Sequence, residues 1–175
     1  MIDMLNDFVS GSLKVERAGR IIPKIRELLD WARGRGIPVI YLCDSHLRNV
    51  DAELSLWGDH AIKGTWGAQV VEELKPREGD FLIEKRRYSG FFGTDLDLLL
   101  RELKVDTVVL TGLVTNVCVQ HTAADAFFRG YRIIVLSDCC EALTEEDHLR
   151  ALEYMRTVYG AQVKTSEELM KEGLE

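Results

Sequence analysis

The chain contains 175 residues and carries a net charge of −7 at pH 7, with an isoelectric point near 5.2. This length suffices for one domain with a substantial core, so we expect a single domain over residues 1–175. An acidic chain whose longest basic cluster is Lys85-Arg86-Arg87 is poorly suited to a nucleic-acid partner. The chain has neither an apolar run of the roughly 20 residues that cross a bilayer nor a signal-like N-terminus. We therefore expect a cytoplasmic protein without a membrane partner.

The pattern of hydrophobic residues alternates between helix and strand periods along the chain. It predicts strands at residues 1–4, 38–45, 80–85, 107–113, 132–138 and 161–165, and helices at 18–32, about 67–74, 94–104, 116–129 and 145–159. Pro23 suits the first turn of its helix, which stops at Gly34, and Thr94 and Thr144 are candidate N-caps. The first strand is short for a central one, so we expect a chain start that is truncated or was assigned late.

Strands rich in Val, Ile and Leu that alternate with helices are typical of a parallel sheet covered on both faces. Right-handed crossovers place the carboxyl ends of such strands along one edge, where ligands bind. Chemically capable side chains follow the first four predicted strands, in the order Asp3, Asp44 with His46, Lys85, and Cys118. The sequence therefore predicts one site at this edge.

Four cysteines without CxxC spacing indicate neither a disulfide framework nor a zinc ribbon. Cys43, Cys139 and Cys140 lie in strand-like segments and are interpreted as small packing residues. Cys118 differs because it follows the strand-like run TVVLTGL where a helix begins. Backbone N–H groups at a helix start favour a thiolate and can hold the oxyanion formed when it attacks a carbonyl.

A cysteine that attacks a carboxamide also needs a base for its own proton and an acid for the leaving ammonia. Asp3 can serve as both if burial raises its pKa, and Lys85 can hold Asp3 in place while favouring the thiolate. Taken alone, each residue has a plainer interpretation. Asp3 suits a turn at a strand end, and Lys85 suits a solvated charge beside Arg86 and Arg87.

A second group of residues has the chemistry of a metal site. Its members are a strand-end pair and two residues of the following loop: Asp44, His46, Glu53 and His60. Asp-x-His at a strand end points both side chains to one side. Mixed nitrogen and oxygen ligands suit Zn²⁺, Fe²⁺ or Mn²⁺ and leave positions open for water or substrate. The alternative interpretation makes His46 and His60 ordinary loop histidines; His121 and His148 lie in helix patterns and are interpreted as structural.

Asp3, Lys85 and Cys118 together resemble the Asp-Lys-Cys triad of the isochorismatase-like cysteine hydrolases, a superfamily that contains nicotinamidases, N-carbamoylsarcosine amidases and ureidoacrylate amidases. IDMLNDF resembles its opening motif, EKRRYSGFFGTDLDLLLREL its lysine motif, and GLVTNVCVQHTAADAFFRGY its nucleophile motif. The resemblance implies a three-layer α/β/α sandwich with a six-stranded parallel sheet of order 3-2-1-4-5-6. It also implies a non-proline cis peptide at Val114-Thr115, with the N–H groups of Thr115 and Cys118 facing the oxyanion.

The four metal candidates resemble the ligands of nicotinamidases, in which the ion holds the pyridine nitrogen of the substrate. Phe8, Trp57 and Tyr88 fall where that family places aromatic residues around a flat ring, and core packing is their alternative interpretation. Ser45 replaces the tryptophan that many nicotinamidases carry between the Asp and the first His, and Leu5 replaces a common glutamine. Both residues also occur in relatives of other specificity.

The resemblance implies an amidase that converts nicotinamide and water to nicotinate and ammonia through a thioester on Cys118, with a divalent metal for which Zn²⁺ is expected and Fe²⁺ or Mn²⁺ are alternatives. The open alternatives are a related ureido or carbamoyl amidase, an isochorismatase, which does not require the thiol, and a non-catalytic α/β binding module. The substrate is expected to be a small amide. Because the superfamily commonly forms dimers or tetramers, we expect a homo-oligomer.

Overall fold

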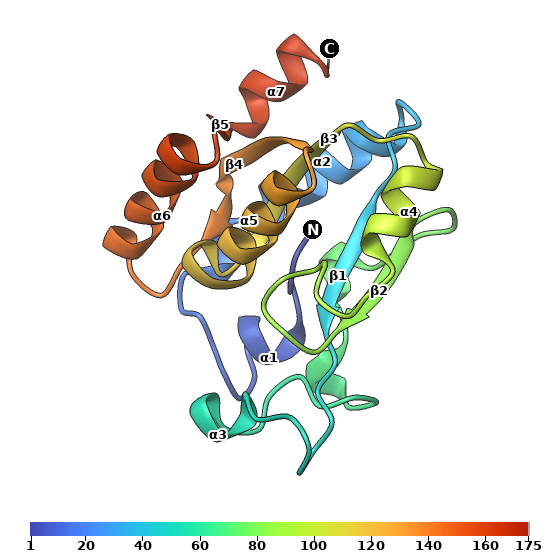
Figure 1. The fold of residues 1–175 in the computed structure, drawn as a ribbon. Coiled ribbons are helices and arrows are strands. Elements are labelled where there is room, and N and C mark those ends of the chain that lie inside the picture. Colours follow the sequence, from blue (N-terminus) through green and yellow to red (C-terminus); the bar gives the residue numbers. More distant parts are fainter. Residues whose placement is uncertain (175) are drawn as a thin grey trace.

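The computed structural model describes residues 1–174 of the chain. The described residues form five strands: β1 (Ile40–Asp44), β2 (Phe81–Lys85), β3 (Thr107–Leu113), β4 (Arg132–Glu141) and β5 (Gln162–Lys164). The α-helices are α1 (Asn6–Val9), α2 (Ile22–Arg33), α3 (Leu54–Trp57), α4 (Leu96–Glu102), α5 (Gln120–Phe128), α6 (Glu145–Val158) and α7 (Ser166–Glu172) (Figure 1). A π-helical turn, η4 (Thr115–Val119), connects β3 to α5.

All strand pairs are parallel and fall into two groups, with the orders β1-β2 and β3-β4-β5. Ile2 joins the groups through single parallel bridges to Leu42 of β1 and Gly112 of β3. The predicted first strand is thus one bridging residue, and the six-stranded order 3-2-1-4-5-6 is not confirmed. The extended backbone ends at Asp3, whose φ of 51° is left-handed. Gly112 is required beside Ile2, because a Cβ there would lie 1.9 Å from the Ile2 carbonyl oxygen.

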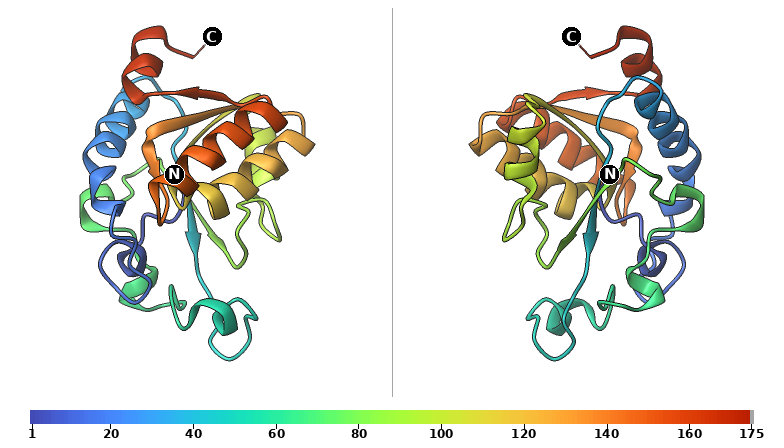
Figure 2. Two further views of the ribbon diagram at one scale, coloured as in Figure 1. Left: turned by 90° about the vertical axis from the view of Figure 1, so that its left-hand side faces the viewer. Right: turned by 90° about the vertical axis from the view of Figure 1, so that its right-hand side faces the viewer.

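Helices cover both faces of the sheet, which gives three layers (Figure 2). On one face, α2 and α7 contribute Ile25, Leu29 and Leu169 to a core that includes Tyr41 of β1. On the other face, α4, α5 and α6 pack over a second core that includes Leu96, Leu110, Ala123 and Met155. Because both faces are buried, the central strands carry continuous Val, Ile and Leu rather than an alternating pattern.

The long helices begin and end where local signals predict. Pro23 lies in the first turn of α2, and Gly34 is its C-cap. The Thr144 side chain caps α6 by accepting a hydrogen bond from the N–H of Asp147. At α4 the N-cap is Asp95 instead of the predicted Thr94.

The predicted helix at 67–74 is wrong. Two short 3-10 turns, Trp66–Ala68 and Glu72–Leu74, replace it. The residues between them are extended because the backbone carbonyl of Gln69 accepts a hydrogen bond from the Asn6 N–H, and the Val71 N–H donates to the Met4 carbonyl. This pairing with a distant segment outweighs the helical pattern.

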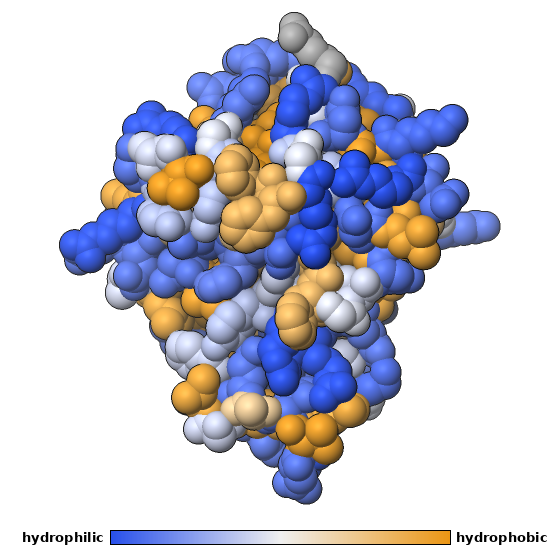
Figure 3. Space-filling model, in the orientation of Figure 1, coloured by the Kyte–Doolittle hydropathy of each residue, from blue (hydrophilic) through white to orange (hydrophobic). Residues whose placement is uncertain are grey.

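The face shown in Figure 3 carries hydrophobic side chains dispersed among hydrophilic ones. Within the part of the chain that the structure describes, no helix is both long enough and apolar enough to cross a membrane.

Candidate active site

The carboxyl ends of β1, β2 and β3 bring the predicted triad together. Asp44 and Lys85 end neighbouring strands and are register partners. Asp3 follows the bridging residue Ile2, and Cys118 lies in η4 just beyond β3. All four functional side chains are buried, with residue exposures between 1% and 6%. Residues that are far apart in sequence therefore meet at one edge of the sheet, away from bulk water.

The Lys85 ammonium group lies at the centre of this cluster. Its Nζ is 2.8 Å from Oδ2 of Asp3 and 3.7 Å from Sγ of Cys118, and it is ion-paired with Oδ1 of Asp44. The other Asp3 oxygen accepts the Asp44 N–H at 2.8 Å. Burial lowers the pKa of Lys85, but the charges of Asp3 and Asp44 raise it well above its usual value. Lys85 is therefore a fixed cation held between two carboxylates.

The protonation states favour Asp3 as the base. Burial and the charge of Asp44 raise the pKa of Asp3 to about 6, although Lys85 opposes the shift. Burial also raises the pKa of the Cys118 thiol well above its usual value, and the charge of Lys85 only partly offsets this. The expected bias toward a thiolate is thus outweighed, and Cys118 rests as a thiol. Asp3 lies beside the thiol, since the ligand atoms of Asp3, Asp44 and Cys118 lie within 4.8 Å of one another.

The cis peptide precedes Val114, not Thr115. It lies between Leu113 and Val114, one residue earlier than predicted and directly at the end of β3. Val114 and Cys118 both line the pocket described below. Thr115 is fully buried instead, and its Oγ1 lies 2.8 Å from Nδ1 of His148.

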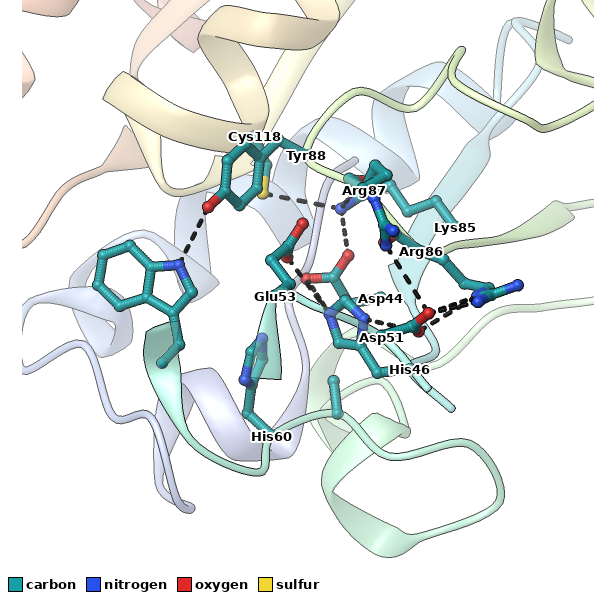
Figure 4. Close-up of polar contacts among 12 residues, drawn as sticks. Asp44, His46, Asp51, Glu53, His60, Lys85, Arg86, Arg87, Tyr88 and Cys118 are labelled. Atoms are coloured by element: carbon teal, nitrogen blue, oxygen red, sulfur yellow. Dashed lines mark hydrogen bonds and ion pairs between the residues drawn. The ribbon is translucent and has the colours of Figure 1, made fainter. Parts of the chain in front are cut away.

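Four possible metal donors gather beside the triad, below Cys118 in Figure 4. The group consists of Asp44, His46, Glu53 and His60, all buried, with ligand atoms within 4.8 Å of one another. His60 directs Nδ1 to the Gly58 carbonyl at 2.8 Å, which leaves Nε2 for a ligand. Nε2 of His46 is 3.5 Å from Glu53 and has no hydrogen-bond partner in residues 1–174. Burial and the charge of Asp44 raise the pKa of Glu53. A divalent cation would satisfy the unpaired nitrogen and neutralise the carboxylates, so the donor set fits a metal.

Asp51 and Arg86 support His46 and were not predicted from the sequence. Nδ1 of His46 lies 3.3 Å from Oδ2 of Asp51, which also accepts the Leu47 N–H at 2.8 Å. Arg86 hydrogen-bonds both oxygens of Asp51, and this holds the pKa of Asp51 far below its usual range. A carboxylate on one imidazole nitrogen orients the other nitrogen toward a metal. The only sequence signal was an acidic residue in the loop after His46, and that loop contains several.

A pocket opens in front of Cys118 and the donor set. Its apolar wall consists of Phe8, Leu13, Val15, Trp57, Tyr88, Leu113, Val114, Val117 and Leu143. The three predicted aromatic residues are all in this wall, and Trp57 donates from Nε1 to the Tyr88 hydroxyl at 3.1 Å. Leu13, Val15 and Leu143 were missed, because they come from loops without a local signal. Within residues 1–174, no lysine or arginine lines the pocket.

Comparison with known proteins shows that this chain is similar to amidases. The isochorismatase domain model matches residues 1–168. The N-carbamoylsarcosine amidase of Thermoplasma acidophilum is 43% identical with a TM-score of 0.89, over 95% of this chain and 94% of that chain. The nicotinamidase/pyrazinamidase PncA of Bacillus subtilis is 35% identical with a TM-score of 0.89, and the match covers 93% of this chain and 96% of that chain. The pyrazinamidase of Pyrococcus horikoshii, solved in complex with zinc, is 32% identical with a TM-score of 0.87. The match covers 94% of this chain and 96% of that chain.

The family match spans nearly the whole chain, and the solved relatives include amidases of two substrate types. The chain therefore belongs to the isochorismatase family, in the part of the superfamily close to the nicotinamidases, and is a hydrolase that acts on amide bonds.

Proposed function

We propose that the protein is a metal-assisted amidase that hydrolyses nicotinamide, or a similar uncharged heteroaromatic carboxamide, to the carboxylate and ammonia. One observation carries the proposal. Cys118 lies between the buried Asp3–Lys85 pair and an aromatic pocket that adjoins a four-residue metal donor set.

The charge of the pocket favours a neutral substrate. Asp3, Asp44 and Glu53 contribute carboxylates to the lining, and no lysine or arginine of residues 1–174 joins them. The three carboxylates together balance the single charge of Lys85, which contacts Asp3 and Asp44, and the two charges of a divalent ion in the donor set. A substrate carboxylate would lose water there without gaining a partner. Nicotinamide is neutral, whereas N-carbamoylsarcosine, ureidoacrylate and isochorismate carry carboxylates.

The shape of the pocket favours a flat ring. Phe8, Trp57 and Tyr88 provide aromatic surfaces around the space in front of Cys118. Aromatic walls with few polar groups are typical of sites that bind planar ligands by stacking and edge contacts.

Asp44, His46, Glu53 and His60 are the residues that would hold the metal, and zinc is favoured by the zinc complex of the Pyrococcus relative. When bound there, the ion supplies a Lewis acid that can hold a ring nitrogen of the substrate.

In the proposed reaction, Asp3 takes the proton from Sγ of Cys118 as the sulfur attacks the carboxamide carbon. In this proposal the oxyanion faces the backbone N–H groups of Val114 and Cys118, two residues that line the pocket, whereas the prediction was Thr115 and Cys118. Asp3 returns the proton to the nitrogen, which leaves as ammonia, and a thioester remains on Cys118. A water molecule deprotonated by Asp3 then hydrolyses the thioester to the carboxylic acid and the free thiol. Lys85 holds Asp3 in place throughout.

A carbamoyl amidase is the second candidate, because the Thermoplasma relative with that name is 43% identical to the chain. The absence of a cation among the described lining residues weighs against it.

The test is ammonia release by the zinc-loaded protein from nicotinamide, pyrazinamide, ureidoacrylate and N-carbamoylsarcosine. We expect kcat/KM for nicotinamide to exceed that for either carboxylate-bearing amide by at least ~100-fold, since a buried unpaired charge is strongly rejected. Faster release from a carboxylate-bearing amide would overturn the proposal. Metal analysis of the purified protein provides a second readout.

A further inference from the structure

A buried hydrogen bond ties the nucleophile turn to helix α6. Thr115, the first residue of η4, is fully buried, and its Oγ1 lies 2.8 Å from Nδ1 of His148. His148 is in the first turns of α6 and is 8% exposed, and its N–H donates to the carbonyl of the N-cap Thr144 at 3.2 Å. The contact therefore joins the turn that carries Cys118 to an independently capped helix.

The contact suits a neutral His148 ring. A neutral imidazole has one nitrogen that accepts and one that donates, and the Thr115 hydroxyl can do either, so its contact with Nδ1 can form a hydrogen bond in either tautomer. Burial keeps the ring neutral by lowering the pKa of His148, and the charges that face it, from Glu141, Glu145 and Arg17, act in opposite directions.

Side chains outside the turn contact its later residues, since Nζ of Lys85 lies 3.7 Å from Sγ of Cys118 and Nδ1 of His121 lies 2.7 Å from the Val117 carbonyl, but neither contact holds its start. Val114, at its N-cap position, has no side-chain cap, and its carbonyl accepts the N–H groups of Val117 and Val119 at 3.0 and 3.2 Å from within the turn. The neighbouring side-chain oxygen, Oδ1 of Asn116, is buried without a hydrogen-bond partner in the described residues. The side chain of Thr115 thus supplies the hydrogen bond that connects the start of the turn to the rest of the fold.

We propose that His148 is a positioning residue for catalysis, which holds Thr115 so that the N–H groups of Val114 and Cys118 point at the substrate carbonyl. The inference rests on the proposed role of Cys118 as the nucleophile. His148 itself is not among the residues that line the pocket. Its function is to keep the donors aligned, since a displacement of about 1 Å in a reacting geometry can cost on the order of 100-fold in rate.

The kinetic test compares His148→Ala with His148→Asn, whose amide oxygen can take the position of Nδ1 and accept the Thr115 hydroxyl. His148→Ala is expected to lower kcat by about 10- to 100-fold and to leave KM within about twofold. His148→Asn is expected to recover most of the lost kcat. The substrate is the amide that the wild-type protein hydrolyses fastest, so the result does not depend on that amide being nicotinamide.

Thr115→Val, which removes the hydroxyl at almost constant volume, provides a second variant in case His148→Ala folds poorly. The single variants and the double variant form a cycle. If one hydrogen bond carries both effects, the double variant loses no more kcat than either single variant. Additive losses would overturn the proposal, as would a His148→Asn variant as impaired as His148→Ala.

Hydrogen exchange supplies a readout that needs no substrate. In His148→Ala, the amides of residues 114–119 are expected to exchange faster than in the wild type, with His148→Asn near the wild type. Met155→Ala is the matched control, because Met155 is buried on α6 two turns further along. It should speed exchange in α6 while kcat stays within about twofold. Unchanged exchange at 114–119 in His148→Ala would overturn the proposal even if no amide were hydrolysed.

Discussion

Nζ of Lys85 lies 2.8 Å from Oδ2 of Asp3, and both side chains are almost completely removed from solvent. Each charge compensates the other inside the protein, where an unpaired charge is costly. The pair also moderates the base, because Lys85 lowers the pKa that burial and Asp44 raise in Asp3.

Replacing Lys85 with methionine should therefore leave less of Asp3 in the deprotonated form that acts as the base. Without the ammonium group, the pKa of Asp3 rises further, so Asp3 is protonated over a wider pH range. The acidic limb of the plot of kcat/KM against pH should move to higher pH, and kcat/KM at pH 7 should fall by roughly 100-fold or more. Lys63→Met, which breaks an exposed pair with Glu84, is the control and should leave the profile in place. An acidic limb that does not move in Lys85→Met would show that Lys85 does not act on the base.

Cys118→Ala should lower kcat by at least ~1000-fold, since no other cysteine among the described residues lines the pocket. The melting temperature should stay close to that of the wild type. Cys139→Ala removes a buried thiol outside the pocket and should retain activity. Mass spectrometry after treatment with an electrophilic amide analogue should find the added mass on Cys118. Undiminished activity of Cys118→Ala would exclude the thioester route.

Asp51→Ala should weaken metal binding by about 10- to 100-fold, because His46 loses the carboxylate that orients its ring. Zinc affinity can be measured by competition with a chromogenic chelator. Asp106→Asn, a change in an exposed carboxylate paired with Arg132, serves as the surface control. Equal zinc affinity in Asp51→Ala and wild type would contradict the role assigned to Asp51.

Asp80 provides a test of stability away from the active site. It accepts from Nη2 of Arg33 at 2.7 Å and from the Arg77 N–H at 2.8 Å, and it joins α2 to the segment before β2. Burial raises its pKa, but the hydrogen bonds from Arg33 and Arg77 lower it below the ordinary value of 3.8. The stabilisation is therefore complete above the unfolded-state pKa and is lost as the pH falls through the lower folded-state pKa.

We expect Asp80→Asn to lower the free energy of unfolding by about 3 kcal/mol at pH 7, and the difference from wild type to shrink as the pH falls below about 4. Urea unfolding at both pH values measures this. Asp30→Asn, which changes an exposed partner of the same arginines, should cost less than ~1 kcal/mol. A deficit in Asp80→Asn that persists unchanged at low pH would assign the effect to packing instead of charge.

Much of the architecture could be predicted because its signals are local. The apolar runs mark β1 to β5 within a few residues, and Pro23, Gly34 and Thr144 mark helix ends through their own backbone chemistry. The segment 66–74 shows the limit, since hydrogen bonds to Met4 and Asn6, which are distant in sequence, decide its conformation. The short α3 and α7 were likewise not predicted.

By itself, the sequence determined the α/β class, the family resemblance and the residues worth testing, because strand ends and motif spacing can be read from neighbouring residues. Only the tertiary structure decided what surrounds those residues. It placed Asp51 behind His46, linked Thr115 to His148, and located the cis peptide before Val114. It also decided that Cys118 rests as a thiol and Asp3 is the better base, because burial and the distances between charges determine their pKa values and neither is encoded in a local pattern.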